Sequence, residues 1–329
     1  MNKLKVTYDI KTIFPVRNLD VCKANGFDNL VEDLKSINGQ ISLPIQFFGD
    51  TFLRFEFVDK VKLKEFKDSK SNDFFLIIES NITIDIEEII EKAFIRESNP
   101  DDLQPELIVV PYFRLLYKTY LTHFLIFTQI AYPGTLWLND AVVLFNNKKM
   151  DEINGISSVL SEYNYSESKW PKLENVTIDK VWKYLINKTN IFHELSKTEI
   201  ERGLNSFTHL FSENYHHNIP VSLFWSLSGL ESLYVTGEVG ITQQLNDKIQ
   251  TFLGDIIENK KILKKLYNYR SGLIHGDLSI PIKDGVLNYD KYNDDLYVMN
   301  SFSAVVLVAS LQKIIKNEMT KLTFKYIYE

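Results

Sequence analysis

Hydrophobic and polar residues alternate with a period of two in several segments of the first 90 residues. The segment Phe52-Leu-Arg-Phe-Glu-Phe-Val58 shows the alternation most regularly, and residues 5–10 repeat it. This period is typical of half-buried strands, because successive side chains of a strand point to opposite faces of a sheet. Two further apolar runs, 74–78 and 82–86, flank Glu79-Ser-Asn81, which predicts a turn between two strands. The beginning of the chain is therefore expected to be rich in strands.

The pattern becomes mixed between residues 86 and 150. Acidic residues in its first turn predict a helix over 86–94, since carboxylates there complement the helix dipole. A long helix is expected over 111–131, where Tyr132-Pro-Gly134 ends it. A strand at 135–145 and a turn at 146–149 complete the region. We predict an N-terminal domain with both strands and helices over residues 1–150.

Residues 151–177 lack a regular hydrophobic period. They are rich in Ser, Asn, Glu and Lys, and Pro171 lies near their end. Such composition is typical of a connection between periodic segments. The prediction is a linker, in which Leu160 and Trp170 could pack onto a domain.

From residue 178 onward the hydrophobic period is helical. Ser196 and Glu199 predict a capping box at the start of a helix through Ser212. Pro220 can occupy the first turn of the next helix, which ends at Tyr234. The other expected helices cover 178–187, 242–253, 256–273 and 296–316. Their lengths and short connections predict an antiparallel helical bundle over 178–329, so the expected fold class is α+β, with a strand-containing domain followed by an all-α bundle.

Composition narrows the class of protein. The 329 residues are 45% hydrophobic and 24% charged, with a formal net charge of -6, which argues against a broad basic surface for nucleic acid. The single cysteine, Cys22, excludes disulfides within the chain and cysteine zinc sites. The most apolar regions, 107–136 and 297–315, are interrupted by polar residues and predict core helices rather than membrane spans. Without a visible signal peptide, a cytoplasmic protein is expected, and no cofactor or metal is called for.

The strongest candidate for chemistry is the segment Leu266-Tyr-Asn-Tyr-Arg-Ser-Gly-Leu-Ile-His-Gly-Asp277. The guanidinium of Arg270 can hold a phosphate, and the imidazole of His275 can carry a proton near neutral pH. In a regular helix, however, two residues five positions apart point about 140° apart. The helix must therefore distort near Gly272, end near Gly276, or be completed by a second copy of the chain.

The spacing by itself has an ordinary structural explanation. Helical arginines usually pair with a carboxylate, and a histidine before a glycine often caps the end of a helix. Arg-x4-His alone therefore does not define a site.

The wider string resembles the signature of HEPN domains, specifically the Apea-like branch, in which Leu-Tyr-x-x-Arg-Ser is followed by two hydrophobic residues and His-Gly. Upstream, Phe224-Trp-Ser-Leu-Ser-Gly-Leu-Glu-Ser-Leu-Tyr234 is similar to the family's helix with a Leu-Glu-x-Leu element. The two elements occur in the family's order. The resemblance covers residues 178–329 and leaves the first half of the chain without a family.

The resemblance implies a helical bundle that forms a homodimer around the Arg/His motif and acts as a metal-independent endoribonuclease. His275 would be the general acid/base as the ribose 2′-hydroxyl attacks the adjacent phosphate, and Arg270 would stabilise the developing charge. Nuclease members often have Asn, Asp or His after the arginine, whereas this chain has Ser271. Some members of the family bind or dimerise without catalysis.

Other residues around the motif are candidate supports. Glu231, at the edge of an apolar helix stripe, is expected to pair with Arg270 or to reach solvent. Tyr267 and Tyr269 flank the arginine and could stack on a base, or pack in the core or in a dimer interface. The basic residues nearby, which could guide RNA or simply be solvated, are Lys260, Lys261, Lys264 and Lys265. The potential metal ligands His209, Glu213, His216 and His217 have no partner elsewhere in the sequence and are expected to be structural, as are His123 and His193.

Two functional hypotheses follow. The first is a dimeric HEPN-type endoribonuclease with RNA as its substrate, acting in antiphage defence, as in abortive infection, or in growth arrest. Its N-terminal domain would sense a trigger. The second is a non-catalytic HEPN module that binds RNA, a nucleotide or a protein partner. RNA cleavage in EDTA distinguishes them.

Overall fold

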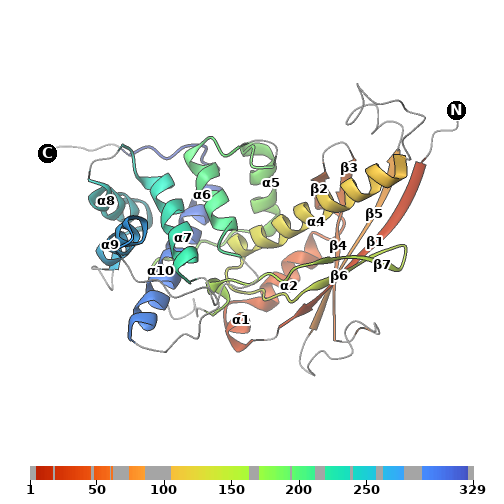
Figure 1. The fold of residues 1–329 in the computed structure, drawn as a ribbon, viewed down its shortest axis with the longest axis horizontal. Coiled ribbons are helices and arrows are strands. Elements are labelled where there is room, and N and C mark those ends of the chain that lie inside the picture. The colour runs from red at the N-terminus through yellow and green to blue at the C-terminus, as the bar shows by residue number, and fades with distance from the viewer. Residues whose placement is uncertain are drawn as a thin grey trace. The chain divides into compact units, whose positions relative to one another are not determined.

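The computed structural model (Figure 1) describes most of the chain: residues 5–17, 19–45, 48–59, 61, 74–85, 105–162, 170–192, 195–211, 219–237, 240–256, 262–277 and 291–324. An antiparallel sheet in the first part is followed by a mostly helical second part, which confirms the predicted α+β class. The chain divides into two compact units. The first contains Met1–Asn18, Asp28–Ile126 and Trp137–Ile156, and the second contains Leu19–Phe27, Phe127–Leu136 and Ser157–Glu329.

The first unit is built on a five-stranded antiparallel sheet. Its spatial order is β4-β5-β1-β6-β7, with bounds Arg54–Val58, Phe74–Asp85, Lys5–Val16, Ala141–Phe145 and Lys148–Ile153. A separate two-stranded sheet pairs β2 (Ser42–Ile45) with β3 (Gly49–Phe52). The unit also contains α2 (Phe27–Ser36), in which Leu30 and Leu34 are fully buried. The sequence did not predict this helix.

The predicted turn at residues 79–81 is wrong, because β5 is one strand of 12 residues. Glu79, Ser80 and Asn81 lie opposite Lys11, Ile10 and Asp9 of β1. Glu79 and Asn81 find partners in those strand neighbours, and Ser80 is buried on the opposite face. The period-two alternation continues through the polar residues, so pairing with β1 outweighs their preference for turns.

The turn between β6 and β7 forms where it was expected. Asn146 and Asn147 have φ angles of 47° and 63°. Positive φ at both central residues is the geometry of a tight hairpin, and asparagine tolerates it better than other non-glycine residues.

The long helix α4 (Pro105–Ala131) packs on one face of the sheet. The Tyr117 hydroxyl lies 3.1 Å from the Thr12 hydroxyl of β1, and Phe124 stacks on Phe55 of β4. The helix begins six residues before the predicted start, with Pro111 inside it. A helix can continue through a proline at the cost of one backbone hydrogen bond. Val109, in the first turns, is fully buried and contributes to compensating that loss.

The second unit is helical. Its elements are α1 (Asp20–Ala24), a short 3-10 helix η4 (Val159–Glu162), α5 (Ile178–Lys188), α6 (Glu199–Thr208), α7 (Ile219–Tyr234), α8 (Ile241–Leu253), α9 (Ile262–His275) and α10 (Lys291–Lys316). These helices form a bundle over most of the predicted range, 178–329.

The helix expected at 86–94, before the bundle, lies outside the described residues.

The centre of the bundle is the contact between α7 and α10. The hydroxyls of Ser226 and Ser303 lie 2.6 Å apart, and those of Tyr234 and Ser310 lie 2.7 Å apart. From the first contact to the second, the residue numbers rise along both helices, so α7 and α10 run parallel. The antiparallel prediction is wrong for this pair. At the crossing, a Cβ on Gly229 would meet Leu307 Cδ2 at 2.9 Å, which shows how closely the helices approach.

The predicted linker is in part core. Within 151–177, Ile153 ends β7, and Val159 and Leu160 are fully buried. The hydroxyl of Ser161 donates to the carbonyl of Leu136 within the second unit. Polar composition misled the prediction because these serines satisfy backbone groups in the interior.

The capping box of α6 lies two residues after the predicted one. The side chain of Thr198, not Ser196, accepts from the backbone of Glu201, and Glu201 returns the bond to Thr198 N. Both pairs obey the same sequence rule. The extra contacts of Glu201 with Asn190 N and Lys197 N, 2.9 Å each, favour the later pair.

Among the described residues, one helical segment is long and apolar enough to cross a membrane by length and composition. It is Asp295–Lys316, which is part of α10. Most of it is buried inside the protein, as in the core helix of a soluble protein. This agrees with the predicted core role of residues 297–315.

Candidate functional site

Helix α9 carries the Arg/His segment and is amphipathic. Its buried side is formed by Ile262, Leu263, Leu266 and Tyr269. The opposite stripe contains Lys264, Asn268, Ser271 and His275, which are exposed or half-buried and fall within about 60° of one another around the axis. Helical spacing alone produces this division, so the bundle determines which side of the segment faces outward.

The helix ends at a glycine, as one of the predicted alternatives required. Gly276 has a φ of 75°, and Asp277 N donates to the carbonyl of Gly272 at 2.8 Å. This is the Schellman arrangement, in which a left-handed residue closes the last turn. His275 is the last helical residue, and Gly272 lies inside the regular helix rather than at a distortion.

Arg270 is held by a carboxylate of a neighbouring helix. Its Nη2 lies 2.8 Å from Glu231 Oε2 on α7, and the two side chains are 26% and 15% exposed. The predicted pair of Glu231 with Arg270 is thus confirmed. The contact uses one oxygen and one terminal nitrogen, while Glu231 Oε1 and Arg270 Nε are buried without a hydrogen-bond partner.

The electrostatics of this pair are dominated by burial. Burial raises the pKa of the Glu231 carboxyl above its ordinary value of 4.5, and the Arg270 guanidinium opposes the shift in part. A carboxylate in such surroundings depends on its cationic neighbour to remain charged. Glu231 therefore orients Arg270. If the guanidinium moves away, the Glu231 carboxylate loses the neighbour that keeps it charged.

Arg270 and His275 do not converge within one chain. The helix is regular between them, so they point about 140° apart and are separated by about 7.5 Å along the axis. Arg270 turns toward α7, whereas His275 is exposed at the helix end. The two groups that the sequence singled out are thus both at the surface of α9, but on different sides of it.

The surroundings of the motif are partly apolar and partly basic. Ile274 is 49% exposed, and Tyr267 and Ser271 are half-buried. Lys264 is exposed, and Lys265 forms a 3.8 Å surface pair with Asp295 of α10. Lys260 and Lys261 lie outside the described residues. Of the predicted supports, Tyr269 belongs to the core.

Other reactive groups are structural where the chain is described. His209 stacks on Trp225 with ring centroids 3.9 Å apart, and burial lowers its pKa. Burial also lowers the pKa of His123. Within the described ranges no group of three or more His, Cys, Asp or Glu residues could hold a metal; His193, Glu213, His216 and His217 lie outside those ranges.

Cys22, on α1, is not an activated nucleophile. The thiol is buried, and burial raises its pKa to about 11, against weaker opposing contacts from backbone groups. Because the thiolate is the reactive form of cysteine, this residue is inert at neutral pH.

A polar cavity on the sheet of the first unit was missed by the sequence analysis. Its lining includes Asp9, Lys11, Arg54, Glu79 and Asn81. These residues come from three strands, and only the pairing of β4, β5 and β1 brings them together. In the sequence, these residues are the polar positions of segments that alternate with a period of two. Such positions by themselves predict only a solvated strand face.

In comparisons with known proteins, no family model, no curated protein and no solved structure matches the chain. The functional conclusion therefore depends on the residues themselves.

Proposed function

We propose that the protein is a metal-independent endoribonuclease of the HEPN type and that Arg270 and His275 are its catalytic residues. The observation that carries the proposal is the contact between Arg270 and Glu231. It joins the two sequence elements on which the HEPN resemblance rests, one on α9 and one on α7, through a 2.8 Å ion pair.

In this mechanism the nucleophile belongs to the RNA. His275 takes the proton of a ribose 2′-hydroxyl or gives one to the leaving oxygen, and Arg270 stabilises the charge that develops on the phosphate. Arg270 has the exposure to reach a phosphate, since 26% of its side chain is accessible. Ser271 and Tyr267 lie beside it on the half-buried border of the helix, and Lys264 adds positive charge on the outer stripe.

The active form in this proposal is a homodimer. Within one chain the arginine and the histidine diverge, so a second copy must supply the missing partner. The outer face of α9 suits such an approach: Ile274 presents apolar surface, and the small residues Ser271 and Gly272 allow two helices to come close. A twofold axis beside α9 would bring the same stripe of each copy together.

The proposal is tested with purified protein and total RNA in the presence of EDTA. Wild-type protein should cleave the RNA, and both Arg270→Ala and His275→Ala should abolish cleavage. Arg202→Ala, which removes an exposed helical arginine on α6, is the matched control and should keep full activity.

Because Arg270→Ala leaves Glu231 buried without its cation, its folding is compared with that of the double variant Arg270→Ala/Glu231→Ala. A folded double variant that still cleaves RNA would remove Arg270 from the mechanism. Cleavage by none of the proteins would contradict nuclease activity under these conditions and favour a non-catalytic module that binds RNA, a nucleotide or a protein.

Three further parts belong to the proposal. A role in antiphage defence or growth arrest rests on the HEPN resemblance, and a trigger sensed by the first unit rests on the resemblance and on the two-part architecture. The third is the cytoplasmic location expected from the sequence.

A further inference from the structure

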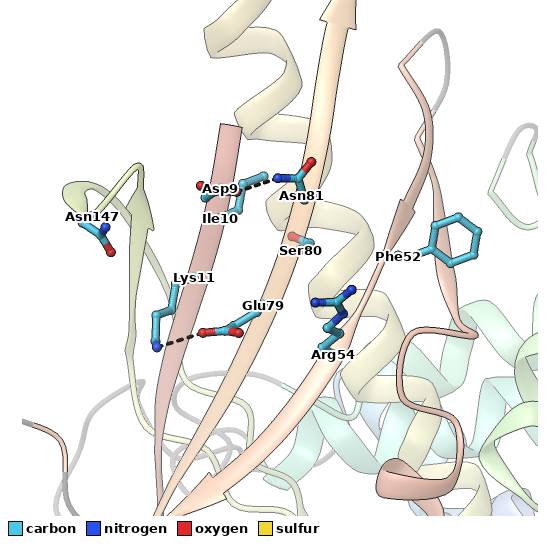
Figure 2. Close-up of a pocket in the computed structure, with 9 residues that line it drawn as sticks. All are labelled: Asp9, Ile10, Lys11, Phe52, Arg54, Glu79, Ser80, Asn81 and Asn147. Atoms are coloured by element: carbon cyan, nitrogen blue, oxygen red, sulfur yellow. Dashed lines mark hydrogen bonds and ion pairs between the residues drawn. The ribbon is translucent and has the colours of Figure 1, made fainter. Parts of the chain in front are cut away.

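The cavity on the first unit lies on the face of the sheet opposite α4, over strands β4, β5 and β1 (Figure 2). Its volume is about 510 Å³, within the range of small-molecule sites, about 300–1,000 Å³. The lining is formed by Asp9, Ile10, Lys11, Phe52, Arg54, Glu79, Ser80, Asn81 and Asn147. Unlike the apolar end of the same face, where Ile13, Phe75 and Val142 are buried, this end is charged.

One row of charged side chains crosses the strands. Glu79 lies opposite Arg54 on one side and Lys11 on the other, and Lys11 Nζ contacts its carboxylate at 2.9 Å. Arg54 has no ion-pair partner among the described residues, although the strand register places it beside the same carboxylate. Two cations thus share one anion, and the excess positive charge of the row belongs to the exposed guanidinium of Arg54. A planar guanidinium with unused donors favours phosphate.

The neighbouring row has the opposite character. Asp9 and Asn81 are opposite each other, and the Asn81 amide donates to Asp9 Oδ1 at 2.5 Å. The described structure shows no cation at Asp9. Both residues line the cavity, as the close-up in Figure 2 shows, and the Asp9 carboxylate and the Asn81 amide carbonyl are groups that accept hydrogen bonds. Such a row suits hydroxyl or amino donors and repels a second anionic group.

The separation of the two rows determines the length of the ligand. Arg54 and Asp9 lie two strands apart, at about 4.8 Å per strand, and two residues apart along the strand direction, at about 3.4 Å per residue, so their backbones are about 12 Å apart. A free phosphate or an amino acid is too short to engage both. Phe52, 50% exposed at the end of the cavity beside Arg54, adds an apolar wall that strengthens a contact between the guanidinium and an anion.

From this arrangement we infer that the sheet cavity is a binding site for a nucleoside phosphate. The phosphate binds Arg54, and the ribose hydroxyls and base amino groups donate to Asp9 and Asn81. The site belongs to the first unit and does not depend on the ribonuclease activity proposed for the second.

The test is a calorimetric titration of the full chain with AMP, GMP, CMP and UMP. The corresponding nucleosides, ribose 5-phosphate and inorganic phosphate are titrated in parallel. At least one mononucleotide should bind saturably, and at least tenfold more tightly than its nucleoside or inorganic phosphate, because each end supplies charge-assisted hydrogen bonds. Arg54→Gln should weaken nucleotide binding at least tenfold, and Lys35→Gln, an exposed cation on α2, should leave it unchanged.

A second variant separates the two ends of the site. Asp9→Ala should weaken binding of the nucleotide without weakening that of inorganic phosphate. Circular dichroism establishes that both variants are folded. The inference is overturned if no mononucleotide binds at low millimolar concentration, if Arg54→Gln binds as wild type does, or if ribose 5-phosphate or inorganic phosphate binds as tightly as the nucleotide.

Discussion

At the scale of single residues, Arg270 and His275 differ in how they are held. Arg270 is fixed by a carboxylate from α7, while His275 is placed by the end of its own helix and the Gly276 turn. An ion pair that is mostly removed from water is sensitive to the loss of either member, because the remaining charge stays in a poorly solvated place. Glu231 is therefore the residue through which the geometry of Arg270 can be tested without touching Arg270.

The pH dependence of stability should reveal the burial of Glu231. Its folded-state pKa is raised above the ordinary 4.5, so the native state binds more protons than the unfolded state between the two values. Glu231→Gln removes this titration. The free energy of unfolding of wild type, minus that of the variant, should therefore be largest below pH 4.5 and should fall as the pH rises through the folded-state pKa.

Urea unfolding of both proteins at a series of pH values measures this difference. A difference that stays constant or grows with pH would contradict the burial of the carboxyl.

At the scale of elements, the start of α6 shows how a helix end is anchored. Burial acts to raise the pKa of Glu201, but hydrogen bonds from the backbone N–H groups of Asn190, Thr198 and Lys197 outweigh it and hold the pKa below 4.5. One carboxylate thus satisfies donors from the helix start and from the preceding loop. The cap joins α6 to the segment that follows α5.

Two hydroxyl variants should separate the observed cap from the neighbouring candidate. Thr198→Ala removes an acceptor for a free backbone N–H and should lower the free energy of unfolding by about 1 kcal/mol. Ser196→Ala, two residues earlier, should change it by less than about 0.5 kcal/mol. Thermal or urea unfolding provides the measurement, and equal losses in the two variants would argue against the Thr198 cap.

Helix α4 contributes to both compact units. Phe124 belongs to the first and stacks on Phe55, with ring centroids 5.5 Å apart. Phe127, three residues later, belongs to the second and stacks on Phe207 at 6.4 Å. A single continuous helix therefore completes two separate cores.

Alanine at these two positions should therefore loosen different parts of the chain. Each variant should lose about 3–5 kcal/mol of local stability, as is typical for a buried phenylalanine. Hydrogen exchange followed by mass spectrometry should show faster exchange in β4 for Phe124→Ala and in α6 for Phe127→Ala. The same pattern of exchange in both variants would contradict the division into two units.

For the whole molecule, the decisive question is how many chains form one active site. If Arg270 and His275 act across a homodimer, each site takes the arginine of one copy and the histidine of the other. Two inactive variants then contain, between them, all the groups needed for one complete site. A site formed within a single chain could not be restored in this way.

Mixing Arg270→Ala with His275→Ala should therefore restore cleavage. After exchange of subunits, about half of the dimers are mixed and each has one intact site, so activity should reach about a quarter of the wild-type value. Native mass spectrometry of the mixture, in which one variant has a mass tag, measures how fully the chains exchange. Complete exchange without restored cleavage would contradict a site that is shared in this way.

The sequence predicted those features whose physical cause is local. Helical periodicity located α7, α9 and the core of α10, and the Asn146–Asn147 pair predicted the hairpin turn. The polar residues of β5 were misread as a turn because their partners, Lys11 and Asp9, are about 70 residues away in the chain. Cross-strand pairing is a non-local interaction that a window of neighbouring residues does not contain.

The same distinction between local and non-local causes applies to the candidate site. By itself the sequence determined that Arg270 and His275 diverge on one helix, since that follows from 3.6 residues per turn. It also left Glu231 two alternatives, a pair with Arg270 or contact with solvent. Only the tertiary structure decided that Glu231 pairs with Arg270, that the helix ends at Gly276 without distortion, and that three strands of the first unit assemble a charged cavity. Packing between elements distant in the chain decides which side chains meet, whereas local periodicity decides only which way each one faces.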